Sequence, residues 1–187
     1  MFGLARAVTL VVVSGLAIFA VSPAIANEIE LHAHRDGDAI VIKAAAFLDV
    51  NVAAAWRVLT DYERYPAFIP DLRSSKVIGR EGGVVTLDQE GDVRLLWMRL
   101  PMRSRLSITE TPQRAVESRQ LTGTMQAFAG RYELELAGDR MRLIYTARLV
   151  IDPEQRSLLD RAMVQTNAKR HFVALVTEIE RAAKAGD

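Results

Sequence analysis

From residue 74 onward the chain alternates apolar and polar positions with a period of two, which predicts strands with one face toward a core and one toward water. Short segments that contain glycine, proline or aspartate separate these stretches and are typical of turns. The predicted strands are 76–80, 84–90, 93–100, 103–109, 115–121, 125–136 and 141–151. Because no separator is long enough for a crossover helix, we expect an antiparallel meander and not a parallel sheet.

The segment before this meander predicts earlier strands and two short helices. Residues 28–34 alternate loosely, and 39–50 form a stronger strand candidate. Asn51 is a suitable N-cap, and apolar side chains at helical spacing predict a helix over 52–60. Two prolines restrict the following residues to one or two helical turns.

A long amphipathic helix is predicted at the end of the chain, capped by Asp152, opened by Pro153 and running to about Ala185. At about 100° per residue, one side of this helix gathers apolar side chains. They are Leu158, Ala162, Phe172, Val173, Val176 and Ile179. The polar residues Gln165, Thr166 and Lys169 fall on the same side. Either they form a polar contact for a ligand, or the helix tilts and Lys169 extends to the rim.

The amino terminus has the layout of a secretory signal peptide. Arg6 supplies positive charge, residues 8–21 are almost wholly apolar, and an Ala-x-Ala end follows. We expect cleavage between Ala26 and Asn27, because this apolar stretch is shorter than the roughly 20 residues of a membrane-spanning helix. The sequence therefore predicts a signal peptide at 1–26 and one domain at 27–187, periplasmic or secreted. An uncleaved inner-membrane anchor is the alternative.

Composition narrows the classes of partner and of chemistry. The chain has 24 basic and 23 acidic residues, and removal of Arg6 with the signal makes the two equal. A formally neutral chain has no overall attraction for nucleic acid, so we expect none as a partner. There is no cysteine, which excludes disulfides, thiolate nucleophiles and thiolate metal sites.

The order of these elements, together with two motifs, resembles the helix-grip fold. The motifs are Val58-Leu59-Thr60-Asp61-Tyr62 with Tyr65-Pro66 and Phe68-Ile69-Pro70, and the run 123–130 followed by Tyr132. They are similar to the polyketide cyclase/dehydrase branch of this START-like superfamily, near the coenzyme Q-binding proteins. The resemblance covers 39–183 and implies an α+β fold. A curved antiparallel sheet of six to seven strands would wrap around the long helix, with two short helices after the first main strand and an apolar cavity beneath.

We expect this cavity to be lined from the sheet and from the long helix. Trp97 and Tyr145 are strong candidates, because each adds a hydrogen-bond donor to a large apolar body. The predicted pocket residues are Leu95, Trp97, Arg99, Leu106, Phe128, Tyr132, Tyr145, Gln165, Lys169 and Phe172. A lid over one mouth of the cavity, or alternatively a wedge that packs the short helices against the sheet edge, would be formed by Tyr62, Tyr65 and Phe68.

Two charged patterns have alternative interpretations. Arginines recur along the middle strands, which is typical of a solvated outer face and would otherwise form a docking face for anionic lipid or a partner. They are Arg94, Arg99, Arg103, Arg105, Arg114 and Arg119. His32 and His34 share one face of a strand near two aspartates, but nothing supplies a fixed third ligand, so we expect no metal site.

No signature of a hydrolase elbow, zinc protease, phosphate loop or dinucleotide fold occurs in the chain. The first hypothesis is a binding or carrier protein, without cofactor, for a lipid, isoprenoid quinone or polyketide-like aromatic, with transient membrane contact left open. The second is a cyclase or dehydratase, for which Lys169 is the only acid–base candidate. The third is a partner-binding module whose cavity is filled by its own side chains. The sequence does not indicate an oligomeric state.

Overall fold

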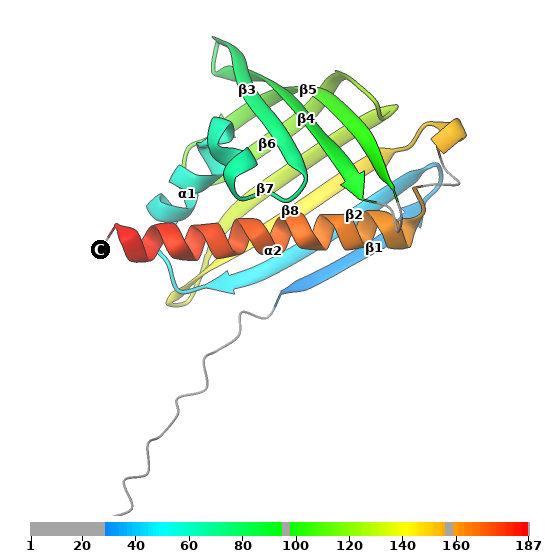
Figure 1. Ribbon diagram of the computed structural model, residues 1–187. Coiled ribbons are helices and arrows are strands. Elements are labelled where there is room, and N and C mark those ends of the chain that lie inside the picture. Colours follow the sequence, from blue (N-terminus) through cyan, green and yellow to red (C-terminus); the bar gives the residue numbers. More distant parts are fainter. Residues whose placement is uncertain (1–28, 95–97, 156–158, 187) are drawn as a thin grey trace, which may run out of the picture.

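The computed structural model describes residues 29–94, 98–155 and 159–186, which form one antiparallel sheet with helices on one face (Figure 1). The eight strands follow the order β1-β2-β8-β7-β6-β5-β4-β3 across the sheet. Their bounds are β1 Glu30–Asp36, β2 Ala39–Leu48, β3 Leu72–Glu81, β4 Val84–Arg94, β5 Arg99–Thr111, β6 Ala115–Gly123, β7 Ala127–Ala137 and β8 Arg140–Val150. The predicted α+β helix-grip architecture is confirmed. The strand count is higher than the six to seven expected, because β1 pairs with β2 along its whole length.

Two long strands, β4 and β5, take the place of three shorter ones predicted between 84 and 109. Gly91 lies inside β4, where a Cβ atom would stand 2.8 Å from the carbonyl oxygen of Asp71. The glycine therefore permits a close backbone approach and does not mark a turn. Pro101 lies inside β5 before the pairing with β6 begins at Ser104, so it occupies an edge position that tolerates a missing N–H.

The two short helices follow β2 as predicted. Helix α1, Val52–Thr60, begins after Asn51, whose side-chain oxygen accepts a hydrogen bond of 2.7 Å from the backbone N–H of Ala54. A 3-10 helix, η1, spans Tyr62–Ala67 and contains Pro66. These caps and prolines act locally, which explains why the sequence alone placed both elements.

The long helix begins later than predicted. Asp152 and Pro153 start only a short 3-10 turn, η2, at Pro153–Gln155. Helix α2 spans Arg161–Ala185, and its N-cap is Asp160, whose carboxylate accepts from the N–H of Met163 at 2.8 Å. Residues 156–158, which include the predicted apolar Leu158, lie outside the described residues.

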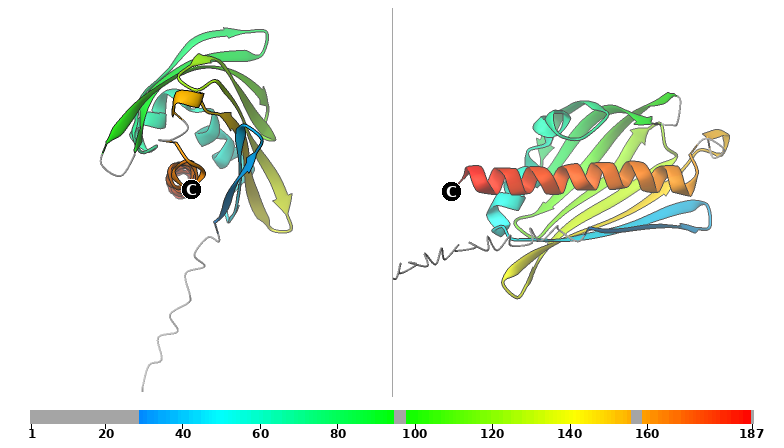
Figure 2. Two further views of the ribbon diagram at one scale, coloured as in Figure 1. Left: turned by 90° about the vertical axis from the view of Figure 1, so that its right-hand side faces the viewer. Right: turned by 60° about the horizontal axis from the view of Figure 1, so that its bottom comes forward.

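The sheet curls around α2, as the view along the helix in Figure 2 shows. Side chains at alternating strand positions belong to one buried apolar cluster with side chains of α1 and α2. Leu143 of β8 and Ile179 of α2 are fully buried in this core. The core therefore lies between the concave face and the helices, and its inner strand positions define where a ligand site can be.

Candidate ligand site between the sheet and the long helix

An aromatic stack lies on the concave face opposite the middle of α2. Tyr132 of β7 and Tyr145 of β8 are direct cross-strand neighbours, and their ring centroids lie 4.5 Å apart with 24° between the planes. Phe172 of α2 continues the stack, 6.4 Å from the ring of Tyr145. The structure thus brings together three of the predicted pocket residues, from two strands and one helix.

The hydroxyl groups of Tyr132 and Tyr145 have no hydrogen-bond partner among the described residues. Burial raises the pKa of both phenols, so both stay protonated at ordinary pH. Both residues are half-buried. A buried tyrosine hydroxyl usually finds a partner. These two can therefore donate hydrogen bonds to an oxygen atom of a bound molecule.

The three predicted lid residues are packed into the structure. Tyr62 is 2% exposed and donates to Glu110 Oε1 at 2.8 Å. Tyr65 donates to the carbonyl oxygen of Leu59 at 2.8 Å, and its ring lies 5.4 Å from that of Phe68, edge to face. Both hydroxyls are thus committed to protein partners. The contacts agree with the alternative interpretation, a wedge that packs η1 against the sheet; a lid function stays a prediction.

A row of uncharged polar side chains crosses four strands on the inner face, and sequence reasoning missed it. Gln89 of β4 donates to Ser75 of β3 at 3.2 Å, and Ser104 of β5 donates to Gln120 of β6 at 3.2 Å. Gln89 and Ser104 face each other across the ladder, which joins the two pairs into one row. A partial signal was present, because Gln89 and Ser104 occupy the same strand face as Leu87 and Leu106. The row adds neutral hydrogen-bonding groups to an apolar wall.

Asn167 and Glu178 are the buried polar residues in the described part of α2. Lys169 does not lie under the sheet, which agrees with the alternative that its side chain extends to the rim. Asn167 is 9% exposed, accepts from the N–H of Arg94 at 3.3 Å and donates to the carbonyl of Arg94 at 3.1 Å. Lys169 is exposed. The predicted apolar side was rotated: Phe172, Val176 and Ile179 are buried, but Ala162 and Val173 are exposed. The cause is that a helical wheel gives relative angles only, whereas the contact with the sheet sets the absolute rotation of the helix.

The other predicted pocket residues are dispersed. Leu106 is buried in the core, and Phe128 is half-buried beside it. Gln165 accepts a hydrogen bond of 3.3 Å from the backbone N–H of Ala33 in the edge strand β1 and so connects α2 to the sheet. Arg99 is 61% exposed and contacts Asp71 at 4.0 Å, so its side chain does not point inward. Leu95 and Trp97 lie outside the described residues.

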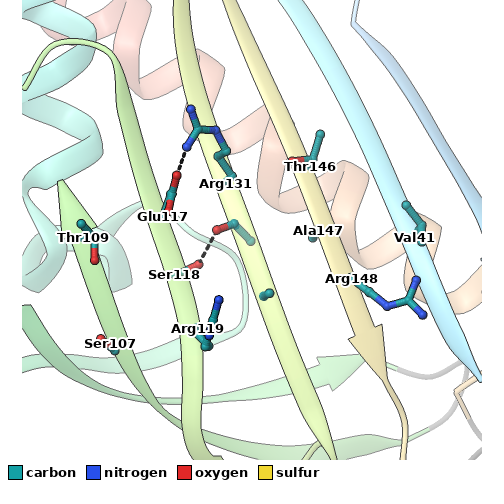
Figure 3. A pocket seen from close by; sticks show the side chains of 12 residues that line it. Val41, Ser107, Thr109, Glu117, Ser118, Arg119, Arg131, Thr146, Ala147 and Arg148 are labelled. Atoms are coloured by element: carbon teal, nitrogen blue, oxygen red, sulfur yellow. Dashed lines mark hydrogen bonds and ion pairs between the residues drawn. The ribbon is translucent and has the colours of Figure 1, made fainter. Parts of the chain in front are cut away.

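Two hollows on the surface of the described residues face solvent. One lies on the outer face of the sheet, with α2 behind it (Figure 3). The other lies along the solvent side of α2 next to Pro70, and Gln165 and Lys169 line it. These two predicted pocket residues therefore border a hollow, on the opposite side of the helix from the one expected.

The histidine pair near the amino terminus lies on the surface. His32 and His34 are exposed on β1, and the neighbouring Asp36 pairs with Arg148 at 2.5 Å. Within the described ranges, no group of three or more metal-ligating side chains comes together.

The curved sheet around a long terminal helix gives the protein the helix-grip fold (Figure 2). Residues 48–178 match the family described as polyketide cyclase / dehydrase and lipid transport, and the chain belongs to this family. The special similarity to coenzyme Q-binding proteins stays a prediction. No curated protein shows significant sequence similarity to the chain.

Solved structures share the fold at low sequence identity. The Zhui aromatase/cyclase from Streptomyces sp. R1128 superposes with a TM-score of 0.62 at 19% identity, over 78% of this chain and 94% of that one. A STAR-related lipid transfer protein from Xanthomonas axonopodis gives 0.65 at 12% identity, over 81% and 93%. A START superfamily protein from Mycobacterium smegmatis gives 0.61 at 12%, over 79% and 99%. At these identities the likeness establishes the fold alone.

Proposed function

We propose that the protein is an exported binding or carrier protein for a hydrophobic small molecule, held between the concave face of the sheet and α2. The observation that carries this proposal is the stack of Tyr132 and Tyr145, two half-buried tyrosines that pack against the apolar core and whose hydroxyls have no hydrogen-bond partner in the described structure. A ligand there would gain from contact with apolar walls and from one or two hydrogen bonds that set its orientation. The family's association with lipid transport supports this class of ligand.

The chemistry of the two phenols narrows the ligand. Because their pKa values are raised, both act as hydrogen-bond donors and complement an acceptor oxygen. Lipids, isoprenoid quinones and polyketide-like aromatics all combine such an oxygen with a large apolar body. The neutral row from Ser75 to Gln120 also suits an uncharged polar group better than a charged one.

Export is the second part of the proposal, and it rests on the signal-peptide layout of residues 1–26. In the part of the chain that the structure describes, no helix has the length and apolar character needed to span a membrane. The proposed location is the periplasm after cleavage at Ala26–Asn27, with an inner-membrane anchor as the alternative.

The alternative function, a cyclase or dehydratase, draws support from the family description and from the aromatase/cyclase fold. Such an enzyme needs a titratable group beside its substrate. Lys169 is exposed, and the phenols of the stack hold their protons. His171 lies beside Pro70 and Asp71, and burial lowers its pKa. Because neither Lys169 nor the phenols of the stack supply an acid–base group, we favour binding over catalysis.

Native mass spectrometry of the protein purified from its own periplasm tests the proposal. We expect a mass that begins at Asn27, together with a second species carrying an unmodified apolar molecule. A protein that emerges without any adduct, and that takes up neither lipid nor an apolar dye in a saturable way, would instead have its interior filled by side chains.

Replacing Tyr145 or Tyr132 by phenylalanine tests the role of the phenols. The binding of a short-chain ubiquinone is measured by its displacement of an apolar fluorescent dye. We expect either change to weaken ubiquinone binding about three- to tenfold, because each removes one hydrogen bond to a carbonyl oxygen. Tyr65→Phe is the matched control, since its hydroxyl is already bonded to Leu59. If ubiquinone displaces the dye equally well from the wild type and from all three variants, the phenols are not ligand contacts.

A further inference from the structure

The hollow on the outer face of the sheet is formed by five neighbouring strands and holds about 720 Å³, within the size range of small-molecule sites. Its floor includes the short side chain of Ala129, which is exposed on this face, and the backbone of Gly130 and Ala147, whose own side-chain positions face the core. Arg119 and Arg148 rise on either side of this floor, and Arg131 borders it above, as Figure 3 shows for the labelled arginines. The hollow is therefore a small, arginine-flanked depression on the face opposite α2.

The strand registers place two of these arginines around one alanine. Arg119 of β6 lies opposite Ala129 of β7, and Ala129 lies opposite Arg148 of β8. Two strand spacings separate the arginines by about 10 Å at the backbone. Two long side chains at that separation can converge on one anion above Ala129, and the methyl group leaves room for it. The row continues with the hydroxyl of Ser107, opposite Arg119 on β5.

The charges of the three arginines are not equally satisfied. Arg131 contacts the carboxylates of Glu117 and Glu133, so its charge is compensated within the sheet. Arg148 pairs with Asp36, but the two side chains are 52% and 61% exposed, and ion pairs at such exposed positions contribute little net stability. Arg119 has no ion-pair partner within the described residues. The Arg119–Ala129–Arg148 row thus carries positive charge that is free to meet an anion.

From this arrangement we infer a second ligand site, distinct from the concave face, that binds a small oxygen-rich molecule through a phosphate or carboxylate group over Ala129. Arginine binds both groups through paired N–H donors, and two guanidinium groups on one anion would fix the orientation of that anion. The hydroxyls of Ser107 and Thr146 line the same hollow and can bond further oxygen atoms.

Anion titrations followed by NMR, at constant ionic strength, test this site with inorganic phosphate and citrate as the probes. We expect saturable shifts of the Arg119 and Arg148 side-chain N–H signals, and the tighter of the two probes indicates whether phosphate or carboxylate is preferred. We expect Arg119→Gln to weaken binding roughly fivefold or more, in line with the loss of a charge-assisted hydrogen bond.

Two further variants separate a built site from general attraction by charge. Ala129→Ile keeps both arginines but fills the floor, and isoleucine suits an exposed strand position, so we expect binding to be lost while the fold is kept. Arg105→Gln removes an equal charge from the same face, where Arg105 pairs with Asp88 at 2.6 Å, and is expected to leave binding unchanged. The inference fails if Arg105→Gln weakens binding as much as Arg119→Gln, if Ala129→Ile binds normally, or if the shifts do not saturate.

Discussion

Replacing Phe172 by alanine is expected to lower the free energy of unfolding by about 3–5 kcal/mol, the usual cost of removing a buried phenylalanine ring. Phe172 is 1% exposed and is the point where α2 meets the tyrosine stack of the sheet. The change removes apolar area from the core, leaves a cavity, and takes away one side of the contact with Tyr145. It therefore acts on the packing between the two layers that the fold depends on.

Val173→Ala is the matched control, because Val173 is the next residue on the same helix but is 38% exposed. We expect its effect to stay within about 0.5 kcal/mol, as for most surface substitutions. Urea unfolding followed by circular dichroism measures both variants. If Phe172→Ala and Val173→Ala lose similar amounts of stability, the side of α2 that carries Phe172 is not buried against the sheet.

Asp71→Asn is expected to lower stability by about 1–3 kcal/mol at neutral pH, the range for charge-assisted hydrogen bonds that are lost at a buried acceptor. The Asp71 side chain is 5% exposed and contacts Arg94 at 3.0 Å and Arg170 at 2.8 Å, so it joins β4 to α2. Without its charge, Arg94 faces the like-charged Arg99 directly across the β4–β5 ladder. Asparagine tolerates the positive φ of 63° at this position, so the variant tests the charge and not the backbone.

The same residue gives a pH dependence with a definite sign. Burial tends to raise the pKa of Asp71, but hydrogen bonds from Arg94 and Arg170 outweigh it and hold the pKa below its ordinary value of 3.8. A carboxyl group whose pKa is lower in the folded state stabilises the protein above its unfolded pKa, and this contribution is lost as pH falls through the folded value. We therefore expect stability to drop below about pH 4, and the drop to be shallower in Asp71→Asn.

Asp88→Asn provides the control for both measurements. Asp88 accepts two hydrogen bonds from Arg105, at 2.6 and 2.7 Å, but this pair lies on the surface, where its net contribution is about 0–1 kcal/mol. The loss of stability in Asp88→Asn at neutral pH should be smaller than that in Asp71→Asn. If the two variants lose the same stability, the arginines around Asp71 contribute no more than an ordinary surface pair.

Elements defined by short-range interactions could be predicted closely from the sequence. Helix α1 has its predicted bounds, because its N-cap is local: the side chain of Asn51 accepts a hydrogen bond from the N–H of Ala54, only three residues along the chain. Gly91 and Pro101 misled the prediction, because both residue types usually mark turns. Here Gly91 admits the backbone of Asp71, which is distant in sequence, and Pro101 lies beyond the reach of β6.

The site could be predicted only in part. Tyr132, Tyr145 and Phe172 were each identifiable as large inward side chains, and the structure joins them into one stack. Asn167 escaped notice because its partner is the backbone of Arg94, 73 positions away. The side on which Lys169 lies could not be predicted, because a helical wheel gives relative angles only, and the contact with the sheet sets the absolute rotation.

By itself, the sequence determined the class of fold, the antiparallel meander, the long terminal helix and the apolar face of each strand. The meander, the long helix and the apolar faces follow from periodicity and local signals, which are properties of neighbouring residues, whereas the class of fold followed from the resemblance of the element order and two motifs to a known family. Only the tertiary structure decided which polar groups face inward, which arginines have partners, and that the pictured hollow lies on the outer face of the sheet. These depend on strand register and on helix rotation, which long-range packing fixes and which no local pattern records.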